Sequence, residues 1–419
     1  TRRGVLWLGQ TCNLRCHFCY FLDRIESRSH KEHDFMSLEK AKQICYQLKN
    51  FYNNNSVDLQ GGEPTIYKDI YELVSYCRSI GLYPSLITNA LVLSDKDKCR
   101  KLSESGIRDC LVSVHGLNET FDKIVRVKGA SKKLMQGLEN LVEAGVPVRF
   151  NCVLSKMALP ELKEIALLAV KLGARVVNFI TFNPFEDQLR KGKRSTENVP
   201  RYSEVAPHLD EALDILSENN IEGNVRYFPI CMVKEAHRKS VYDFQQLPYD
   251  IHEWDYVSWT WTSMTPQKIK EGDLSHPVSL RDISMRSMNV PESLHFAASS
   301  MQKFLSLFPF LLSPTKKIYH KMSFLINRFS SKKKDFENKE AFYLENAKYR
   351  RNLGGYVYSF KCQQCAARDI CDGFHGDYAS IFGSEEALPV RIDKKIVDPK
   401  YFISDQQKVV EKEDYDWAL

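Results

Sequence analysis

The sequence lacks the features of a secreted or membrane-spanning protein. Its 419 residues contain no run of about 18 consecutive apolar residues, which a transmembrane helix needs. The first four residues, Thr-Arg-Arg-Gly, are not followed by the apolar stretch and cleavage site of a signal peptide. These two absences indicate a cytoplasmic protein.

The chain also has little excess charge of either sign. Lysine and arginine number 59 and aspartate and glutamate 53, so the net charge is only +6. Such a balance does not indicate a nucleic-acid-binding protein. Hydrophobic residues make up 43% of the chain, which excludes long-range disorder. The length favours two or three domains over a single core.

The 12 cysteines are too few for a disulfide scaffold in a chain of this length. Five of them lie within apolar segments and are interpreted as small buried side chains: Cys45, Cys77, Cys99, Cys110 and Cys152. The other seven stand in motif-like positions: Cys12, Cys16, Cys19, Cys231, Cys362, Cys365 and Cys371. This usage favours thiolate-bound metal in a reducing, cytoplasmic compartment.

Up to residue 181 one pattern recurs, in which a helix ends at a glycine, two residues follow and an apolar strand begins. Strands are predicted at 4–8, 56–59, 84–88, 109–114, 148–153 and 176–181, with helices between them. Continuous apolar strands separated by helices are typical of parallel sheets. Six such units with right-handed crossovers predict an α/β fold, a partial (β/α)6 barrel, with its chemistry at the C-terminal strand ends.

The pattern changes after residue 185. We expect a core at 1–185, a bridging helix and strand with Cys231 at 186–240, an irregular insertion at 241–350, and a cysteine-containing domain with a charged tail at 351–419. In the insertion, Trp254, Trp259 and Trp261 are interpreted as pocket or core residues. The apolar segment 304–312 precedes many basic residues, and we favour a core helix with a solvated basic face over contact with a membrane surface.

Two motifs follow the first two predicted strands. Cys12, Cys16 and Cys19 form a C-x3-C-x2-C loop, and three thiolates leave one coordination position of a metal centre open, as in catalytic sites. A zinc site completed by His17 is the alternative. The second motif is Gly-Gly-Glu-Pro-Thr at 61–65. Its glycines let backbone approach a ligand closely, and its glutamate offers an acceptor for an ammonium group, unless the motif is a tight turn with an exposed acid.

Together the two motifs resemble the radical S-adenosylmethionine (SAM) superfamily over roughly residues 4–185. The resemblance implies a [4Fe–4S] cluster on Cys12, Cys16 and Cys19, with SAM bound to the open iron. It also implies an electron donor such as flavodoxin or ferredoxin, and reductive cleavage of SAM to a 5′-deoxyadenosyl radical that takes a hydrogen atom from the substrate. The residues that it places around SAM are Phe18 near the adenine and Gly61, Gly62, Glu63 and Pro64 at the methionine end.

Other polar residues follow the later strands. Ser113-Val-His115-Gly116 departs from the Ser-x-Asp-Gly common in the family, so His115 is a catalytic candidate that contacts SAM or transfers a proton to or from substrate. Asn89 is a further expected SAM contact. Ser113 and Asn151 are expected to bind the ribose or the carboxylate of SAM, and Arg126 to pair with that carboxylate. For each residue the alternative is a loop polar group without a ligand.

The third motif is Cys362-x2-Cys365-x5-Cys371. With Cys231 it has the four thiolates that complete a second [4Fe–4S] cluster. The pattern resembles the SPASM or twitch auxiliary-cluster domains that follow many radical SAM barrels. A structural zinc site is one alternative, and an open iron without Cys231 is another. Auxiliary-cluster relatives often modify peptides, so oxidation or cross-linking of a peptide is the expected function. A sugar, nucleoside or lipid substrate is the alternative.

Overall fold

The computed structural model describes residues 3–30, 33–50, 54–182, 184, 195–246, 348, 351–352 and 355–403. Its central feature is one curled sheet whose eight strands run parallel in chain order. The strands are β1 (Arg3–Trp7), β2 (Ser56–Gln60), β3 (Tyr83–Thr88), β4 (Asp109–Ser113), β5 (Val148–Leu154), β6 (Val176–Thr181), β7 (Glu222–Arg226) and β8 (Val241–Tyr242). The predicted partial barrel is confirmed, and β7 and β8 extend its sheet past residue 185.

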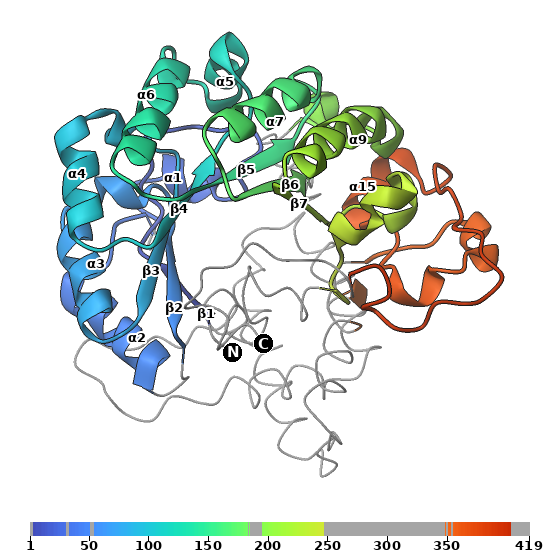
Figure 1. Cartoon of the computed structure of the whole chain (residues 1–419), viewed down its shortest axis with the longest axis horizontal. Helices are drawn as coiled ribbons and strands as arrows, with labels where there is room; N and C mark the ends of the chain where they lie inside the picture. The colour runs from blue at the N-terminus through green and yellow to red at the C-terminus, as the bar shows by residue number, and fades with distance from the viewer. Residues whose placement is uncertain are drawn as a thin grey trace. The chain divides into compact units, whose positions relative to one another are not determined.

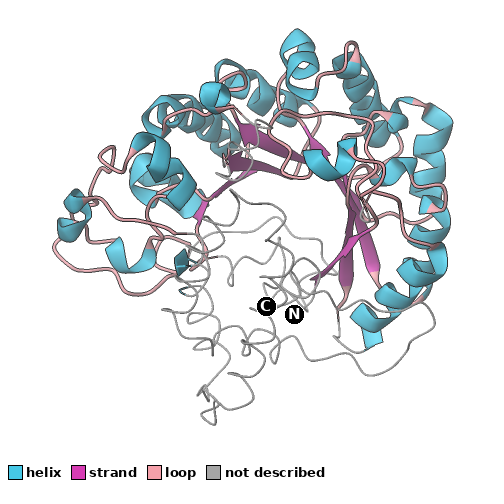
Figure 2. Ribbon diagram, turned by 180° about the vertical axis from the view of Figure 1, so that it is seen from behind, coloured by secondary structure: helices cyan, strands magenta, loops and turns pink. Residues whose placement is uncertain are grey.

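Helices follow most of the strands and cover one face of the sheet (Figures 1 and 2). They are α2 (Leu38–Asn50), α3 (Ile70–Ser79), α4 (Lys96–Glu104), α5 (Asn118–Val125), α6 (Ala130–Glu143), α7 (Leu162–Lys171) and α9 (Tyr202–Glu218). The short helix α1 (Leu22–Glu26) follows the cysteine loop, and α15 (Gly376–Phe382) belongs to the C-terminal segment. The five cysteines interpreted as buried side chains are all buried. The first six strands lie close to their predicted positions with helices between them, and α9 and β7 are the predicted bridging helix and strand, whereas α1, α5 and β8 were not predicted.

Two glycines show which side of each strand faces the helices. A Cβ atom on Gly4 of β1 would lie 2.8 Å from the Leu48 side chain of α2, and one on Gly223 of β7 would lie 2.4 Å from Leu213 of α9. Neighbouring residues of a strand point to opposite faces. The side chains of Arg3 and Asn224 therefore point to the other face, which lines the inside of the curled sheet.

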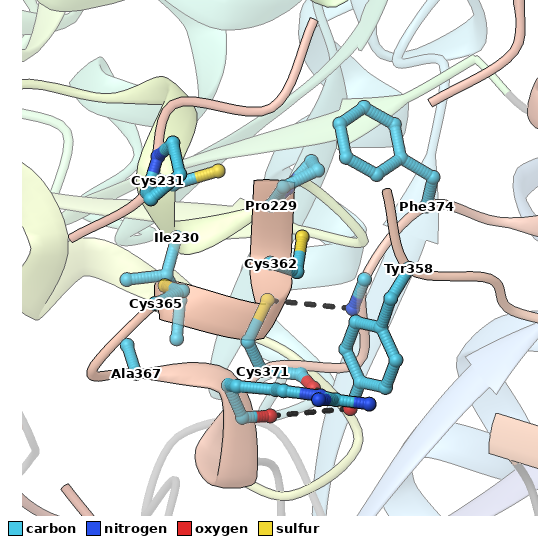
Figure 3. A pocket seen from close by; sticks show the side chains of 12 residues that line it. Pro229, Ile230, Cys231, Tyr358, Cys362, Cys365, Ala367, Cys371 and Phe374 are labelled. Atoms are coloured by element: carbon cyan, nitrogen blue, oxygen red, sulfur yellow. Dashed lines mark hydrogen bonds between the residues drawn. The ribbon is translucent and has the colours of Figure 1, made fainter. Parts of the chain in front are cut away.

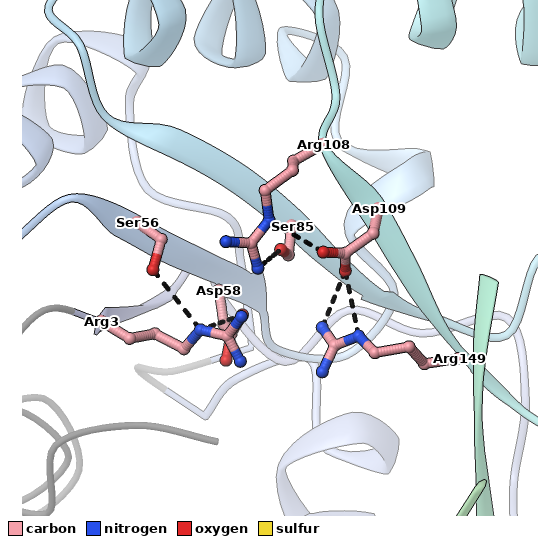
Figure 4. Close-up of polar contacts among 7 residues, drawn as sticks. All are labelled: Arg3, Ser56, Asp58, Ser85, Arg108, Asp109 and Arg149. Carbon is pink, nitrogen blue, oxygen red and sulfur yellow. Dashed lines mark hydrogen bonds and ion pairs between the residues drawn. The ribbon is translucent and has the colours of Figure 1, made fainter. Parts of the chain in front are cut away.

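An ion-pair network lies at the N-terminal ends of the strands on this inner face (Figure 4). Asp109 accepts hydrogen bonds from Arg108 at 2.9 Å and from two nitrogens of Arg149 at 3.1 and 2.7 Å. On β1 and β2, Arg3 and Asp58 form an ion pair at 3.8 Å. All five side chains are buried. The network joins the strand ends opposite to those that carry the cysteine loop, so its contribution is to stability.

We expect Asp109→Ala to lower the free energy of unfolding by about 3–5 kcal/mol, because Arg108 and Arg149 would keep a buried charge without this partner. Burial by itself would raise the pKa of Asp109, but Arg149, Arg108 and Arg3 outweigh it and hold that pKa well below its usual range. This contribution is therefore fully present above about pH 4 and is lost as the pH falls further.

Urea denaturation at pH 7 and at lower pH measures both effects. The matched control is Asp97→Ala, which removes an exposed carboxylate paired with Arg100 at 3.0 Å. Exposed pairs contribute little, so this variant should unfold like the wild type. Equal stabilities of the Asp109 and Asp97 variants would contradict the assignment.

The C-terminal segment packs on α9 and on the residues that follow β8. Tyr378 of α15 stacks on Tyr202 of α9 with ring centroids 3.8 Å apart and an interplanar angle of 4°. The Asp372 carboxylate accepts a hydrogen bond from the Phe244 backbone N–H at 2.6 Å. The backbone N–H of Asp372 donates to the Asp243 carboxylate at 3.0 Å. These contacts hold the third cysteine motif beside the end of β7.

Trp254, Trp259, Trp261 and the apolar segment 304–312 lie outside the described residues. Within the described part of the chain, no helix is long and apolar enough to cross a membrane.

Candidate active site

The first three cysteines lie in the loop that follows β1, and each is partly exposed. The loop is held from one side by the end of α5, whose Val125 and Ile124 carbonyls accept hydrogen bonds from the N–H groups of Arg15 and His17 at 3.0 and 3.1 Å. Because these two N–H groups flank Cys16, the contact fixes the middle of the motif. Arg126 caps α5 with φ of 58° and is exposed beside this contact.

The thiols of this loop need a cation to become thiolates. Burial, with Glu63 nearby, raises the pKa of Cys12 to about 12, and burial with Cys19 and Cys12 nearby raises the pKa of Cys16 well above its usual range. A coordinated metal centre supplies the positive charge that stabilises thiolates. Among the described residues no three His, Cys, Asp or Glu side chains lie close enough to hold a single metal ion. A four-iron cluster does not need this, because each thiolate binds a different iron.

The Gly-Gly-Glu motif holds the cysteine loop from the other side. The Gly62 N–H donates to the Gly9 carbonyl at 2.8 Å, and the Glu63 N–H donates to the Thr11 carbonyl at 2.9 Å. A Cβ atom on Gly62 would lie 2.1 Å from the Thr11 carbonyl oxygen, and one on Gly61 would lie 2.2 Å from that of Gly9. The two glycines therefore let the backbone approach the cysteine loop itself, which the sequence analysis did not predict.

Glu63 is a buried acid, so the alternative of an exposed acid in a tight turn is wrong. Its side chain is 1% exposed. Oε1 accepts hydrogen bonds from the Thr65 N–H at 2.9 Å and from the hydroxyls of Thr65 and Thr88 at 2.6 Å, while Oε2 accepts, among the described residues, one hydrogen bond, from the Asn89 N–H at 2.7 Å. Oε2 therefore has room for a further donor, as the predicted ammonium contact requires. Pro64 opens the buried turn that follows.

Asn89 links the end of β3 to the cysteine loop. Its Nδ2 donates to Oδ1 of Asn13 at 2.7 Å, and its Oδ1 accepts from the Leu91 N–H at 3.1 Å. Asn13 directly follows Cys12. One end of this amide thus holds the cysteine loop, and the other end holds the turn after β3.

Phe18 and His115 face each other in an aromatic cluster. Their ring centroids lie 4.6 Å apart at an interplanar angle of 82°, and Phe182 packs on Phe18 at 6.2 Å. The Val153 N–H donates to Nδ1 of His115 at 3.2 Å, which assigns the ring proton to Nε2. Burial, with His17 nearby, lowers the pKa of His115 to about 3. His115 is therefore neutral at pH 7 and offers one hydrogen-bond donor, Nε2–H.

This neutral histidine makes stability depend on pH. Between its unfolded pKa of about 6.5 and its folded pKa of about 3, the unfolded state binds a proton that the folded state does not, so stability falls as the pH drops through this range. We expect His115→Gln to reduce the slope by up to about 1.4 kcal/mol per pH unit, approached below the unfolded pKa. Urea denaturation from pH 7 to pH 5 measures the slope. An unchanged slope would show that the histidine is charged in the folded protein.

Ser113 and Asn151 lie side by side, as the prediction for a shared ligand requires. Ser113 ends β4 and is the register partner of Asn151 on β5. Asn178 and Asn224 continue this row on β6 and β7, and the sequence analysis did not identify them. Asparagine is disfavoured in strands. An asparagine in the middle of an apolar strand was therefore the sequence feature that could have identified these two residues.

The remaining four motif cysteines line one pocket (Figure 3). Cys231 comes from the turn after β7, and Cys362, Cys365 and Cys371 come from two short 3₁₀ turns of the C-terminal segment. Backbone N–H groups of Gly373 and Val390 donate to the sulfurs of Cys371 and Cys365, each at 3.3 Å. The fold thus brings Cys231 beside a motif that begins 362 − 231 = 131 residues later.

Known proteins are similar to parts of this chain. Residues 8–184 match the Radical SAM superfamily. An Fe-coproporphyrin III synthase of Methanosarcina barkeri is 31% identical over 162 residues, which are 38% of this chain and 39% of that protein. A probable GTP 3′,8-cyclase of Sulfurisphaera tokodaii is 27% identical over 223 residues, 53% of this chain and 67% of that protein.

Among solved structures, Streptococcus suis SuiB is 17% identical with a TM-score of 0.44, over 61% of this chain and 54% of SuiB. The match to the synthase leaves more than half of that relative uncovered. Residues 8–184 of this chain therefore form a domain of the radical SAM superfamily, which implies a [4Fe–4S] cluster and SAM as its cofactors.

Proposed function

We propose that this protein uses a radical generated from SAM to oxidise or cross-link a peptide during the maturation of a natural product. The observation that carries the proposal is the pocket lined by four cysteines in addition to the cysteine loop of the radical SAM domain. When bound, the reduced [4Fe–4S] cluster supplies the electron that cleaves SAM to methionine and a 5′-deoxyadenosyl radical. Flavodoxin or ferredoxin is the proposed electron donor.

In this proposal the residues of the domain hold and orient SAM. Cys12, Cys16 and Cys19 would hold the cluster through three of its irons, which would leave the fourth for SAM. Oε2 of Glu63 accepts a hydrogen bond from the SAM ammonium group, and the Phe18 ring contacts the adenine. The Nε2–H of His115 donates to the ligand beside Phe18, because Nδ1 is already bonded to the Val153 N–H.

Further contacts to SAM come from three polar side chains. Ser113 and Asn151 bind the ribose or the carboxylate, and the exposed Arg126 pairs with the carboxylate. Asn89 acts indirectly, because its hydrogen bond to Asn13 fixes the residue that follows Cys12. These roles rest on placement: Ser113 ends β4, Asn151 is its register partner on β5, and Arg126 caps α5 beside the cysteine loop.

The second set of cysteines gives the reaction its electron acceptor. The substrate loses a hydrogen atom to the 5′-deoxyadenosyl group and then loses one electron and one proton, which oxidises it by two electrons in all. Cys231, Cys362, Cys365 and Cys371 would hold a twitch-like auxiliary cluster that takes the electron, and solvent takes the proton. The N–H donors on two of the sulfurs suit thiolate ligands, whose charge they stabilise.

A small-molecule substrate is the second candidate. The relatives named above include proteins described as a GTP 3′,8-cyclase and an Fe-coproporphyrin III synthase. A nucleoside, sugar or lipid substrate would use the same SAM site.

The test is to incubate the reconstituted protein with SAM, dithionite and either GTP or short peptides encoded by genes beside its own. We expect one peptide to increase 5′-deoxyadenosine formation and to lose two hydrogen atoms in its mass spectrum. Stimulation by GTP, with every peptide left unchanged, would instead support the second candidate.

A further inference from the structure

A row of carboxamides crosses the inner face of the sheet. Asn151 on β5, Asn178 on β6 and Asn224 on β7 are successive register partners, and Ser113 on β4 begins the row. Register partners on neighbouring strands point to the same face of a sheet. The position of Gly223 against α9 places Asn224, and so the row, on the inner face.

The row ends on an amide without a hydrogen-bond partner. Asn224 is 0% exposed, and neither its Nδ2 nor its Oδ1 has a partner among the described residues. Oδ1 of Asn151 also lacks a partner there. A buried polar group left without a hydrogen bond costs about 1–3 kcal/mol, and native proteins accept such costs mainly at functional sites.

Asn140 is a buried asparagine with a structural role, and it serves as a comparison for Asn224. Asn140 of α6 is 4% exposed, and its Nδ2 donates to the carbonyls of Leu93 and Ser94 at 2.8 and 3.1 Å. Its Oδ1 accepts from Gln136 at 3.2 Å. Asn140 therefore ties α6 to the end of the β3 loop, whereas the amide of Asn224 ties nothing together within the described part of the chain.

The place of the row in the fold indicates what it binds. One end of the row is Ser113 and Asn151, the proposed SAM contacts, and the other is Asn224 on β7. Six residues after Asn224 the backbone turns at Ile230–Met232 and carries Cys231 into the pocket of the second cysteine set. A ligand along the row would extend from the SAM site toward the second set of cysteines. This is the path that a substrate needs if it gives a hydrogen atom at one end and an electron at the other.

We propose that Asn178 and Asn224 form a substrate site that binds a peptide group through paired hydrogen bonds, with Asn151 at its SAM end. A carboxamide offers one acceptor oxygen and two N–H donors, so a row of them pairs with the C=O and N–H of a peptide backbone or with an amide side chain. The inference rests on the proposed function for its peptide ligand. Its first test is independent of SAM chemistry.

The first test compares stability. Asn224→Leu and Asn224→Ala remove an amide without partners, so Asn224→Leu should unfold at the wild-type urea concentration or higher. Asn140→Leu and Asn140→Ala delete the same atoms from a bonded amide and should unfold at clearly lower urea. The Ala pair keeps the comparison valid if Leu does not fit. If the Asn224 variants lose as much stability as the Asn140 variants, the amide has a structural or water-binding role, and the proposal is overturned.

The second test measures binding of N-acetylalanine methylamide, a probe with two peptide groups, by saturation-transfer NMR. We expect transfer to this probe with the wild type and with Asn140→Ala, and its loss with Asn224→Leu. The analogue with an ester in place of the methylamide lacks one N–H and should give weaker transfer. Equal transfer in wild type and Asn224→Leu, or none in the wild type, overturns the site. Because no electron transfer is involved, failure here leaves the radical reaction itself untouched.

Discussion

Replacing Cys12, Cys16 and Cys19 together by Ala is expected to remove one of two clusters and all SAM cleavage. Two [4Fe–4S] clusters give about eight irons per chain after anaerobic reconstitution, and the triple variant should keep about four. The loss is complete because these thiols are the proposed ligands of the SAM-binding cluster. Iron and sulfide analysis, together with chromatography of 5′-deoxyadenosine, measures both effects.

The matched control replaces Cys99, Cys110 and Cys152, which are buried in α4, β4 and β5 and belong neither to the cysteine loop nor to the lining of the second pocket. This control should lose stability but keep its iron, because deletion of a small buried side chain leaves a cavity and no lost ligand. A Cys12, Cys16 and Cys19 variant with wild-type iron and sulfide would show that the assignment of the cluster loop is wrong.

The second large effect is expected from Cys231→Ala. The loss of one of four thiols should make the second cluster labile, while the SAM-binding cluster and substrate-free SAM cleavage persist because their ligands are unchanged. Loss of an outer-shell partner alone costs a metal site about 10–100-fold. Peptide turnover should therefore fall by at least this factor. Iron content, the spectrum of the reduced protein and peptide mass spectra measure the three quantities.

Cys152→Ala is the single-site control, since this cysteine is buried in β5 and does not line the pocket. If Cys231→Ala kept wild-type iron, spectra and turnover, the Cys231 thiol would be a buried side chain without a ligand role. The second cluster would then have an open iron, and direct binding of the substrate to that iron would be the better hypothesis.

The sequence predicted those parts of the fold that local signals specify. Each glycine that ends a helix is a local requirement: Gly81, Gly106, Gly145 and Gly173 all have positive φ, which other residues adopt only with strain. The apolar strands that follow them are buried on both faces, as a parallel sheet requires. The two-residue strand β8 and the short helix α5 carry no comparable signal, since neither has a long apolar repeat.

The site was predictable in its residues but not in their contacts. The Gly-Gly-Glu motif was expected beside SAM, yet the close approach of Gly61 and Gly62 to Gly9 and Thr11 depends on how two loops meet in space. The row from Asn151 to Asn224 depends on the register of strands that lie more than 20 residues apart. Neither register nor loop packing follows from hydrophobic periodicity, because both are decided by tertiary contacts.

The central claim is that this chain cleaves SAM reductively, and the most direct measurement is 5′-deoxyadenosine formation by the reconstituted wild type with SAM and dithionite. We predict slow formation without substrate, dependent on both reagents, accompanied by equal amounts of methionine. Glu63→Gln should form less, because a charge-assisted hydrogen bond to the SAM ammonium becomes a neutral one, a difference of about 1–2 kcal/mol. A protein that carries a fully reduced [4Fe–4S] cluster, binds SAM and releases no 5′-deoxyadenosine would contradict the account.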